Sequence, residues 1–235
     1  MTFIDRDRNL KHPEGLTDPQ EQLALEIFNV RVIKFGEYRL KLHEENPEAP
    51  LSPVYFDIRV VTLHPEVLRS VANVYRGLSL EVEGFDAVLG IPDAGIPLAT
   101  AFSLITETPQ IVLRKEAKRG HGIEGQFLTQ YDPETYKRVL VLDDLMTTAK
   151  SKIETLDILE GADLIVTDVC VLLDRDQNGL GKQQLKARGV DFHSAYTLEA
   201  LLNFYARVGK ITHKQHEDIK SRLADLSKFI KGKSS

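Results

Sequence analysis

The stretch VLVLDDLMTTAKS, residues 139–151, decides the predicted fold and raises a question about two charges. Four apolar residues lead directly into two adjacent acids, Asp143 and Asp144, which hydroxyl-bearing side chains follow. A carboxylate at the end of a buried strand costs free energy unless a partner stabilises it. The stretch therefore predicts a buried strand, a polar turn with something to bind, and a helix that opens after the acids.

Segments with strand-like and helix-like patterns alternate on both sides of this stretch. Continuous apolar strands that alternate with helices are typical of a parallel sheet covered on both faces. We therefore predict an α/β fold with a central, mainly parallel sheet flanked by helices. The expected strands are 86–91, 109–114, 137–144, 164–174 and 190–196, and the expected helices are 96–107, 152–161 and 183–189.

The flanks differ from this core, and we predict one domain over residues 1–235 with three parts. A small N-terminal lobe (about 1–60) is expected to contain a helix at 19–29 and short strands within 32–42 and 52–59. The α/β core covers about 61–200, and two helices fill about 197–235. The acidic, proline-bearing segment 43–52 is predicted to be an exposed loop.

Composition narrows the class of protein. The 235 residues carry a formal net charge of -5, whereas a sequence-independent nucleic-acid binder is expected to be basic. No apolar run approaches the ~20 residues of a membrane span, and the charged N-terminus does not resemble a signal peptide. The single cysteine, Cys170, lies in an apolar run and is interpreted as a buried, inert thiol. We expect a cytoplasmic protein without nucleic-acid or membrane partners.

The position of the two acids answers the opening question. Ligands of open parallel sheets bind at the carboxyl ends of the strands, where Asp143 and Asp144 are expected. The first N–H groups of the following helix lack partners within the helix, and with nearby hydroxyls they form an anion cradle. Acids beside such a cradle suit a ribose 5-phosphate, whose hydroxyls donate to the carboxylates. The cradle hydroxyls belong to Thr147, Thr148 and Ser151.

The stretch has three other possible interpretations. A phosphatase of the haloacid dehalogenase type needs Asp-x-Asp, because alternate residues of a strand point the same way, and here the acids are adjacent. A GxxxxGKS phosphate loop is absent, which argues against a nucleoside triphosphatase. The acids could also simply cap the helix, although one acid commonly suffices for that.

At this point a family resemblance emerges from several segments. VLVLDDLMTTAKS resembles the phosphoribosyl-diphosphate signature of type I phosphoribosyltransferases, and other segments, in family order, resemble orotate phosphoribosyltransferases. These segments are KFGEYRLK (34–41), SPVYFDIR (52–59), GIPDAGIPLAT (90–100), RKEAKRGHG (114–122) and LLDRDQNG (172–179). The resemblance implies transfer of a phosphoribosyl group from phosphoribosyl diphosphate to orotate, giving orotidine 5'-monophosphate and pyrophosphate in UMP biosynthesis.

The resemblance also implies a cofactor and site residues. Mg²⁺ is expected on the diphosphate, with no direct protein ligand. The implied catalytic residues are Lys118, His121, Asp143 and Asp144. The implied ligands of phosphoribosyl diphosphate are Lys41, Arg114, Lys115, Lys118, His121, Asp143, Asp144, Thr147, Thr148, Ala149, Lys150 and Ser151. The implied orotate contacts are Tyr55, Phe56, Thr147 and Arg175. In the family, the basic loop around Lys118 reaches into a neighbouring subunit's site, which implies a homodimer.

Arg175 favours orotate over uncharged bases, because a guanidinium can hold a carboxylate in bidentate geometry. An ordinary ion pair with Asp174 or Asp176 is the alternative interpretation.

Departures from the family pattern keep two further alternatives open. Asp93 and Ala94 replace a tyrosine and often a lysine, and Ala149 and Lys150 replace a glycine and a small residue. Transfer to another base, or binding of phosphoribosyl diphosphate by a non-catalytic regulator, would be compatible with these changes. No His/Cys cluster suggests a transition-metal site, and His213 and His216 are expected to be solvated.

Overall fold

The computed structural model describes residues 15–118, 125–176 and 178–233, and the chain divides into two compact units. The terminal unit combines Met1–Val61 with Leu198–Ser235, and the central unit is Thr62–Thr197.

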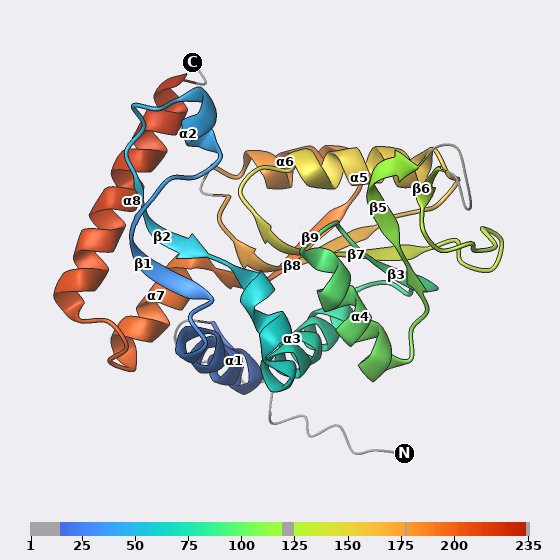
Figure 1. The fold of residues 1–235 in the computed structure, drawn as a ribbon, viewed down its shortest axis with the longest axis horizontal. Helices are drawn as coiled ribbons and strands as arrows, with labels where there is room; N and C mark the ends of the chain where they lie inside the picture. Colours follow the sequence, from blue (N-terminus) through green and yellow to red (C-terminus); the bar gives the residue numbers. More distant parts are fainter. Residues whose placement is uncertain (1–14, 119–124, 177, 234–235) are drawn as a thin grey trace. The chain divides into compact units, whose positions relative to one another are not determined.

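A five-stranded parallel sheet forms the middle of the central unit (Figure 1). Its strand order is β4-β3-β7-β8-β9, so the strand with the two acids lies at the centre. The predicted parallel sheet is thereby confirmed. The strands are β3 (Ala87–Gly90), β4 (Gln110–Ile111), β7 (Val139–Met146), β8 (Asp168–Asp174) and β9 (Asp191–Thr197).

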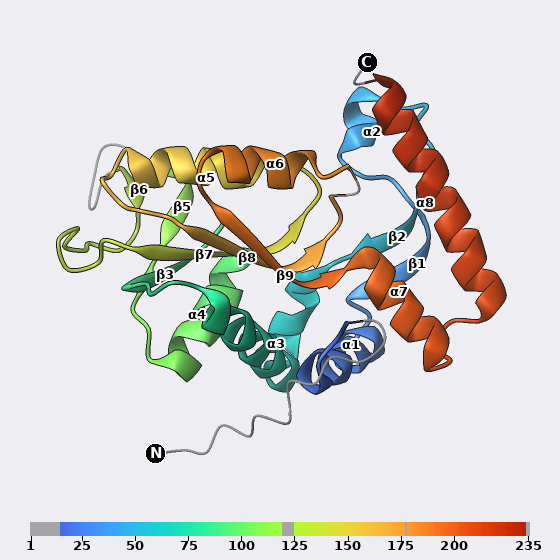
Figure 2. The same ribbon diagram turned by 180° about the vertical axis from the view of Figure 1, so that it is seen from behind.

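Helices cover both faces of this sheet, as predicted. Figures 1 and 2 show α3 (Pro65–Leu78) and α4 (Gly95–Thr106) on one face, and α5 (Lys150–Glu160) and α6 (Leu180–Ala187) on the other. The sequence analysis had predicted no helix at α3. This helix begins with a proline in its first turn and buries one stripe that includes Val67, Val71 and Tyr75. Short 3-10 turns lie at Ile58–Leu63 and Ser79–Glu81.

The predicted strand 109–114 is wrong in part, because the chain leaves the sheet after Ile111. Within this stretch only Gln110 and Ile111, which form β4, pair with β3. The next strand, β5 (Leu113–Lys118), pairs instead with β6 (Gly125–Phe127) in a separate antiparallel hairpin. The basic segment, residues 114–122, therefore begins on a hairpin strand that is not part of the parallel sheet.

The core of the central unit follows the alternation of its strands. Val139 and Val141 of β7 pack in one cluster with Leu156 and Leu159 of α5. Because successive side chains of a strand point to opposite faces, Asp143 continues this α5-facing row.

The terminal unit contains the two predicted short strands, the predicted helix near residues 19–29 and the two predicted C-terminal helices. Strands β1 (Ile33–Tyr38) and β2 (Ser52–Phe56) pair antiparallel, and β2 packs against α8. The Tyr205 hydroxyl donates to the Ala24 carbonyl at 2.8 Å, which ties α7 to α1. The helices are α1 (Asp18–Asn29), α2 (Leu42–Glu45), α7 (Leu198–Arg207) and α8 (His213–Lys233).

Two expectations for the terminal unit are wrong. The segment 43–52 is not simply an exposed loop, because it overlaps α2 and wraps around the buried ring of His43. That ring accepts from the Leu40 N–H at 2.8 Å and lies 3.3 Å from the Pro50 carbonyl oxygen. His216 was expected to be solvated, but it is buried beside Asn203 of α7.

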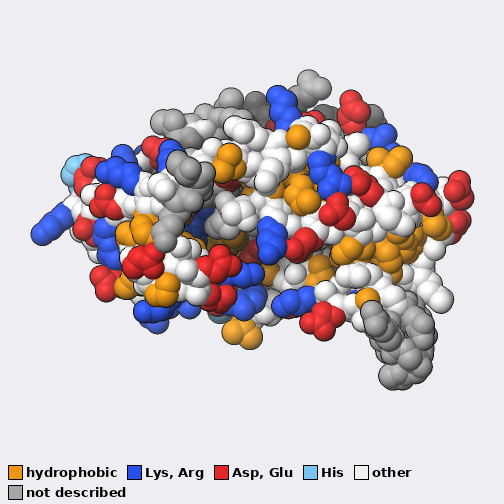
Figure 3. Space-filling model, turned by 90° about the horizontal axis from the view of Figure 1, so that it is seen from above, with side chains coloured by type: hydrophobic (Ala, Val, Ile, Leu, Met, Phe, Trp, Pro, Cys, Tyr) orange, Lys and Arg blue, Asp and Glu red, His pale blue; other side chains and the backbone are white. Residues whose placement is uncertain are grey.

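None of the helices in the described ranges is long and apolar enough to cross a membrane. On the face seen in Figure 3, acidic and basic side chains are interspersed.

Candidate active site

The two acids lie inside β7, and two further residues of the strand follow them. The strand continues because Leu145 and Met146 still pair with Leu173 and Asp174 of β8. The predicted boundary at residue 144 was therefore two residues short. Consecutive positions on a strand send Asp143 and Asp144 to opposite faces, so the acids have different surroundings.

Asp143 is buried in an ion pair that the sequence analysis missed. Its Oδ2 accepts from Lys152 Nζ at 2.6 Å, and its Oδ1 accepts from the Asp144 N–H at 2.9 Å. Lys152 Nζ also donates to the Leu145 carbonyl at 2.5 Å, and only 3% of its side chain is exposed. The Tyr75 hydroxyl donates to the Asp143 carbonyl at 2.7 Å. Both carboxylate oxygens of Asp143 therefore have partners within the protein.

The position of Lys152 in the sequence is a signal that it is buried, because it lies on the same helical stripe as the buried residues of α5. The buried residues of α5 are Lys152, Thr155, Leu156 and Leu159, at positions i, i+3, i+4 and i+7. Ile153, the first apolar residue of this helix, is only partly buried. A lysine that opens a buried helical stripe needs a buried anion, and Asp143 is that anion.

Asp144 is the more accessible acid, and its ionisation is less favourable than that of an ordinary aspartate. Its Oδ1 accepts from the Leu145 N–H at 2.7 Å. Burial, and next the neighbouring charge of Asp143, raise the pKa of Asp144 to about 7, while Lys152 opposes the shift. Asp144 thus gains from any ligand that donates hydrogen bonds or brings positive charge.

The segment after β7 presents hydroxyls to solvent at the start of a helix. Thr147, Thr148 and Ser151 are exposed, and Ala149 is the buried N-cap residue of α5. The φ of Ala149 is -80°, which any residue adopts, so the alanine fits without the freedom of a glycine. Lys150 is exposed at the first helical position.

The turn between β3 and α4 is tightly packed and carries an acid. A Cβ on Gly90 would lie 2.1 Å from the Gly95 carbonyl oxygen, so only glycine fits there. Asp93, which occupies the middle of this turn, is exposed and pairs with Lys115 Nζ at 3.4 Å. The ammonium group of Lys115, on β5, therefore lies beside the turn between β3 and α4.

The remaining residues of the basic segment differ in what the structure shows. A guanidinium nitrogen of Arg114 donates to the Gly125 carbonyl at 3.2 Å and to the Phe127 carbonyl at 2.5 Å, across the hairpin. The Lys118 side chain and His121 lie outside the described residues.

Arg175 follows β8, next to the strand that carries the acids. Its N–H donates to the Met146 carbonyl at 2.7 Å, and burial lowers the pKa of its guanidinium. The flanking acids are both held by Lys182, which the sequence analysis did not single out. Lys182 Nζ donates to Asp174 at 2.7 Å, and its N–H donates to Asp176 at 3.0 Å.

The other predicted contacts belong to the terminal unit. Phe56 is buried in its core, whereas Tyr55 is half-buried, with its ring 5.4 Å from that of Tyr38. Lys41 is exposed at the start of α2. An open hollow of this unit is lined by Arg39, Leu40, Lys41, His43, Glu44 and Tyr55.

A parallel sheet with an acidic pair on its central strand, followed by a hydroxyl-bearing helix start, places the chain among the α/β proteins whose ligands bind at the carboxyl ends of the strands. Residues 61–213 match the phosphoribosyl transferase domain family. The chain belongs to the phosphoribosyltransferase family, and within it to the orotate phosphoribosyltransferases.

Three comparisons show the extent of this likeness. The chain is 36% identical over 176 residues to orotate phosphoribosyltransferase of Pyrobaculum islandicum, covering 73% of this chain and 83% of the relative. It is 32% identical over 209 residues to uridine 5'-monophosphate synthase of Bos taurus, covering 88% of this chain but 41% of the relative. The solved UMP synthase of Leishmania donovani superimposes with a TM-score of 0.70 at 31% identity. The match covers 87% of this chain and 42% of the synthase chain. The chain thus spans about two fifths of these synthases.

Proposed function

We propose that the protein transfers the phosphoribosyl group of phosphoribosyl diphosphate to orotate in UMP biosynthesis. A bond forms between orotate N1 and ribose C1 as N1 loses its proton, the bond from C1 to the diphosphate oxygen breaks, and pyrophosphate leaves with that electron pair. The proton goes to water or to the departing pyrophosphate. The observation that carries the proposal is the half-buried Asp144 beside the hydroxyl-bearing start of α5. This is a site for sugar hydroxyls next to a phosphate.

The two acids have different roles in this proposal. Asp144 accepts hydrogen bonds from the ribose hydroxyls. Asp143 is a positioning residue, because Lys152 and the Asp144 N–H already occupy its oxygens. The 5-phosphate is held by the first N–H groups of α5 and by the hydroxyls of Thr147, Thr148 and Ser151. The exposed Lys150 can reach the same phosphate from the first turn of the helix.

Cations around the departing pyrophosphate complete the proposed chemistry. Lys115 is already placed at the β3–α4 turn by Asp93, and Lys118 and His121 follow it in the chain. The residues fit Mg²⁺, because the half-buried carboxylate of Asp144 on β7 gains from nearby positive charge. Oxygens of the phosphoribosyl diphosphate would provide most of the ligands of the ion. The ion would neutralise charge that develops on the leaving group.

Orotate selection is assigned to Arg175. A partly desolvated guanidinium gains more from a carboxylate than a solvated one does, and orotate has a carboxylate where uracil has none. Tyr55, Phe56 and Lys41 of the terminal unit are proposed to contact the base or the diphosphate on resemblance alone.

The test is the loss of orotate absorbance in the presence of phosphoribosyl diphosphate and Mg²⁺. Turnover that requires both is expected, and uracil, adenine, guanine and hypoxanthine serve as competing bases. Arg175→Ala should weaken orotate use by about 2–5 kcal/mol while the apparent constant for the donor changes far less. An equal change in both constants would show that Arg175 is structural.

One observation favours a second function, a regulator that binds the donor without turnover. Asp93 offsets part of the charge of Lys115, the cation that the proposed transfer uses beside the pyrophosphate. Calorimetric binding of phosphoribosyl diphosphate without product at high protein concentration would support the regulator and overturn the transferase.

A further inference from the structure

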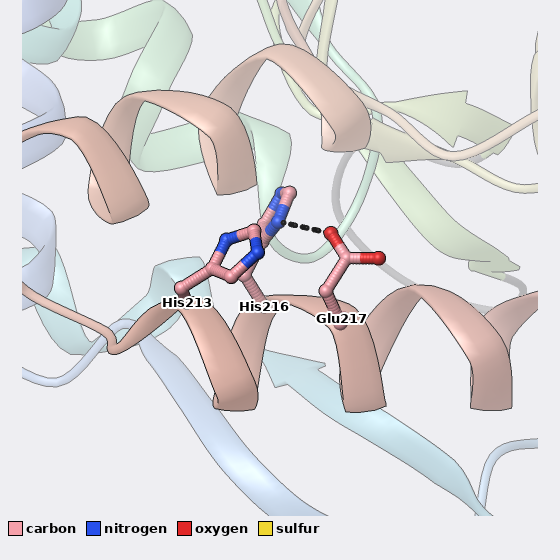
Figure 4. Close-up of side chains that lie close together, drawn as sticks. All are labelled: His213, His216 and Glu217. Atoms are coloured by element: carbon pink, nitrogen blue, oxygen red, sulfur yellow. Dashed lines mark hydrogen bonds and ion pairs between the residues drawn. The ribbon is translucent and has the colours of Figure 1, made fainter.

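Three side chains with metal-binding groups gather at the start of α8. His213, His216 and Glu217 occupy positions i, i+3 and i+4, which share one face of a helix. Figure 4 shows all three projecting to the same side, and their ligand atoms lie within 4.8 Å of one another. We name them the α8 cluster. His216 is buried in it, and the other two are exposed.

Hydrogen bonding fixes which nitrogen of His216 carries a proton. Its Nε2 lies 2.9 Å from Oδ1 of Asn203 on α7. An amide oxygen only accepts, so Nε2 donates, and in a neutral ring Nδ1 then carries a lone pair. That Nδ1 lies 3.2 Å from Oε1 of Glu217, which when ionised also only accepts. In this arrangement two acceptor atoms face each other, and a positive centre between them would satisfy both.

The positive centre is either a second proton on the ring or a metal ion, and His213 favours the metal. A proton needs only His216 and Glu217, whereas a third ligand on the same face completes a facial set. The exposed positions of His213 and Glu217 leave the set open to an ion and to water. The positive end of the α8 dipole opposes a cation here, and the carboxylate of Glu217 offsets it.

We propose that the α8 cluster binds a divalent ion of the zinc class. Two imidazole nitrogens and one carboxylate oxygen, with water in the fourth position, form a donor set that suits Zn²⁺, whereas Mg²⁺ prefers oxygen ligands alone. Ligand distances of about 2 Å around Zn²⁺ require the exposed side chains to rotate inward slightly. Asn203 orients the ring of His216 as an outer-shell partner, so the ion stabilises the contact between α7 and α8.

The experiment is zinc titration of the tag-free full chain by calorimetry, with Mg²⁺ as the comparison ion. One Zn²⁺ per α8 cluster is expected, and each of His213→Ala and Glu217→Gln should abolish or strongly weaken that binding. Both changes are at exposed positions, so folding should be retained. Asn203→Leu should weaken binding by about 10–100-fold. The matched control is His64→Ala, since His64 Nδ1 also lies near a carboxylate, 3.7 Å from Glu66, outside the cluster. This control should bind zinc like the parent.

Two results would overturn the proposal. One is the absence of zinc binding at micromolar free ion, together with nitrogen NMR shifts that show both ring nitrogens of His216 protonated. The other is binding that survives both His213→Ala and Glu217→Gln. Neither outcome bears on orotate turnover, so this proposal and the proposed transferase fail separately.

Discussion

Asp144 shows how one half-buried carboxylate links stability and ligand binding to pH. Its pKa in the folded protein, about 7, exceeds the ordinary aspartate value of about 3.9. The folded chain therefore binds more protons than the unfolded chain between these values, and the stability from this group falls as pH rises through about 7. Donor binding should change in the opposite direction, because the ionised carboxylate is the better acceptor for ribose hydroxyls.

We therefore predict that the affinity for phosphoribosyl diphosphate rises with pH through about 7. Calorimetry across this range measures the change, and Asp144→Asn is the control, because it removes the titration of Asp144 and keeps that of the other groups and of the donor's phosphates. Identical pH profiles for the parent and Asp144→Asn would contradict the role of Asp144.

Lys152 is predicted to be essential for stability. Lys152→Met leaves Asp143 as an uncompensated buried charge, which should lower the free energy of unfolding by about 3–5 kcal/mol. Urea unfolding measures the loss. Lys150→Met, two residues away but exposed, should stay within about 0.5 kcal/mol of the parent. Adding Asp143→Asn to Lys152→Met should recover part of the loss, and additive losses would show that the two residues are not coupled.

These residues also show the limit of reading the site from sequence. The motif indicated Asp143 and Asp144 because adjacent acids after an apolar run are rare without a ligand. Their division of roles was not visible, because it depends on which face of β7 meets α5. Lys152 becomes the partner of Asp143 only when that face is known.

At the scale of elements, the β3–α4 turn gives the sharpest prediction. Gly90→Ala places a methyl group 2.1 Å from the Gly95 carbonyl oxygen, and a Cβ on Gly95 would lie 2.8 Å from the Leu142 carbonyl oxygen, so backbone must move. We expect a loss of about 1–3 kcal/mol in unfolding free energy, together with weaker donor binding. Chemical denaturation and calorimetry measure these effects. Gly77→Ala is the control, because open space surrounds that position within α3. Equal effects of the two changes would contradict the close approach.

Elements with a strong pattern were predicted well, and those decided by distant partners were not. All seven residues of β8 are buried, and its continuous apolar run indicated such a strand. The run at 109–114 looked equally continuous, but the chain leaves the sheet at Val112, whose N–H donates to Thr129 Oγ1 at 3.1 Å. That partner is seventeen residues away along the chain, beyond the reach of a local pattern.

At the scale of the whole molecule, the family assignment rests on the order of the matching segments along the chain rather than on any single motif. The strand order β4-β3-β7-β8-β9 places the acids of β7 beside the end of β8, where Arg175 follows. Segments far apart in the sequence thus meet at one edge of the sheet. The resemblance could anticipate this meeting, whereas hydrophobic periodicity alone could not.

The last prediction concerns assembly, where we propose a homodimer that shares the basic segment between subunits. Lys118→Ala and Asp144→Asn should each be inactive, and a mixture of them should regain activity after subunit exchange. Random pairing of equal amounts gives half mixed dimers, each with one site that has both parts intact, so activity should reach about a quarter of the parent level. The control is a mixture of Lys115→Ala with Lys118→Ala, since both changes lie on the same segment and no pairing restores an intact one. Mixed dimers confirmed by differential tagging but without recovered activity would show that each subunit completes its own site.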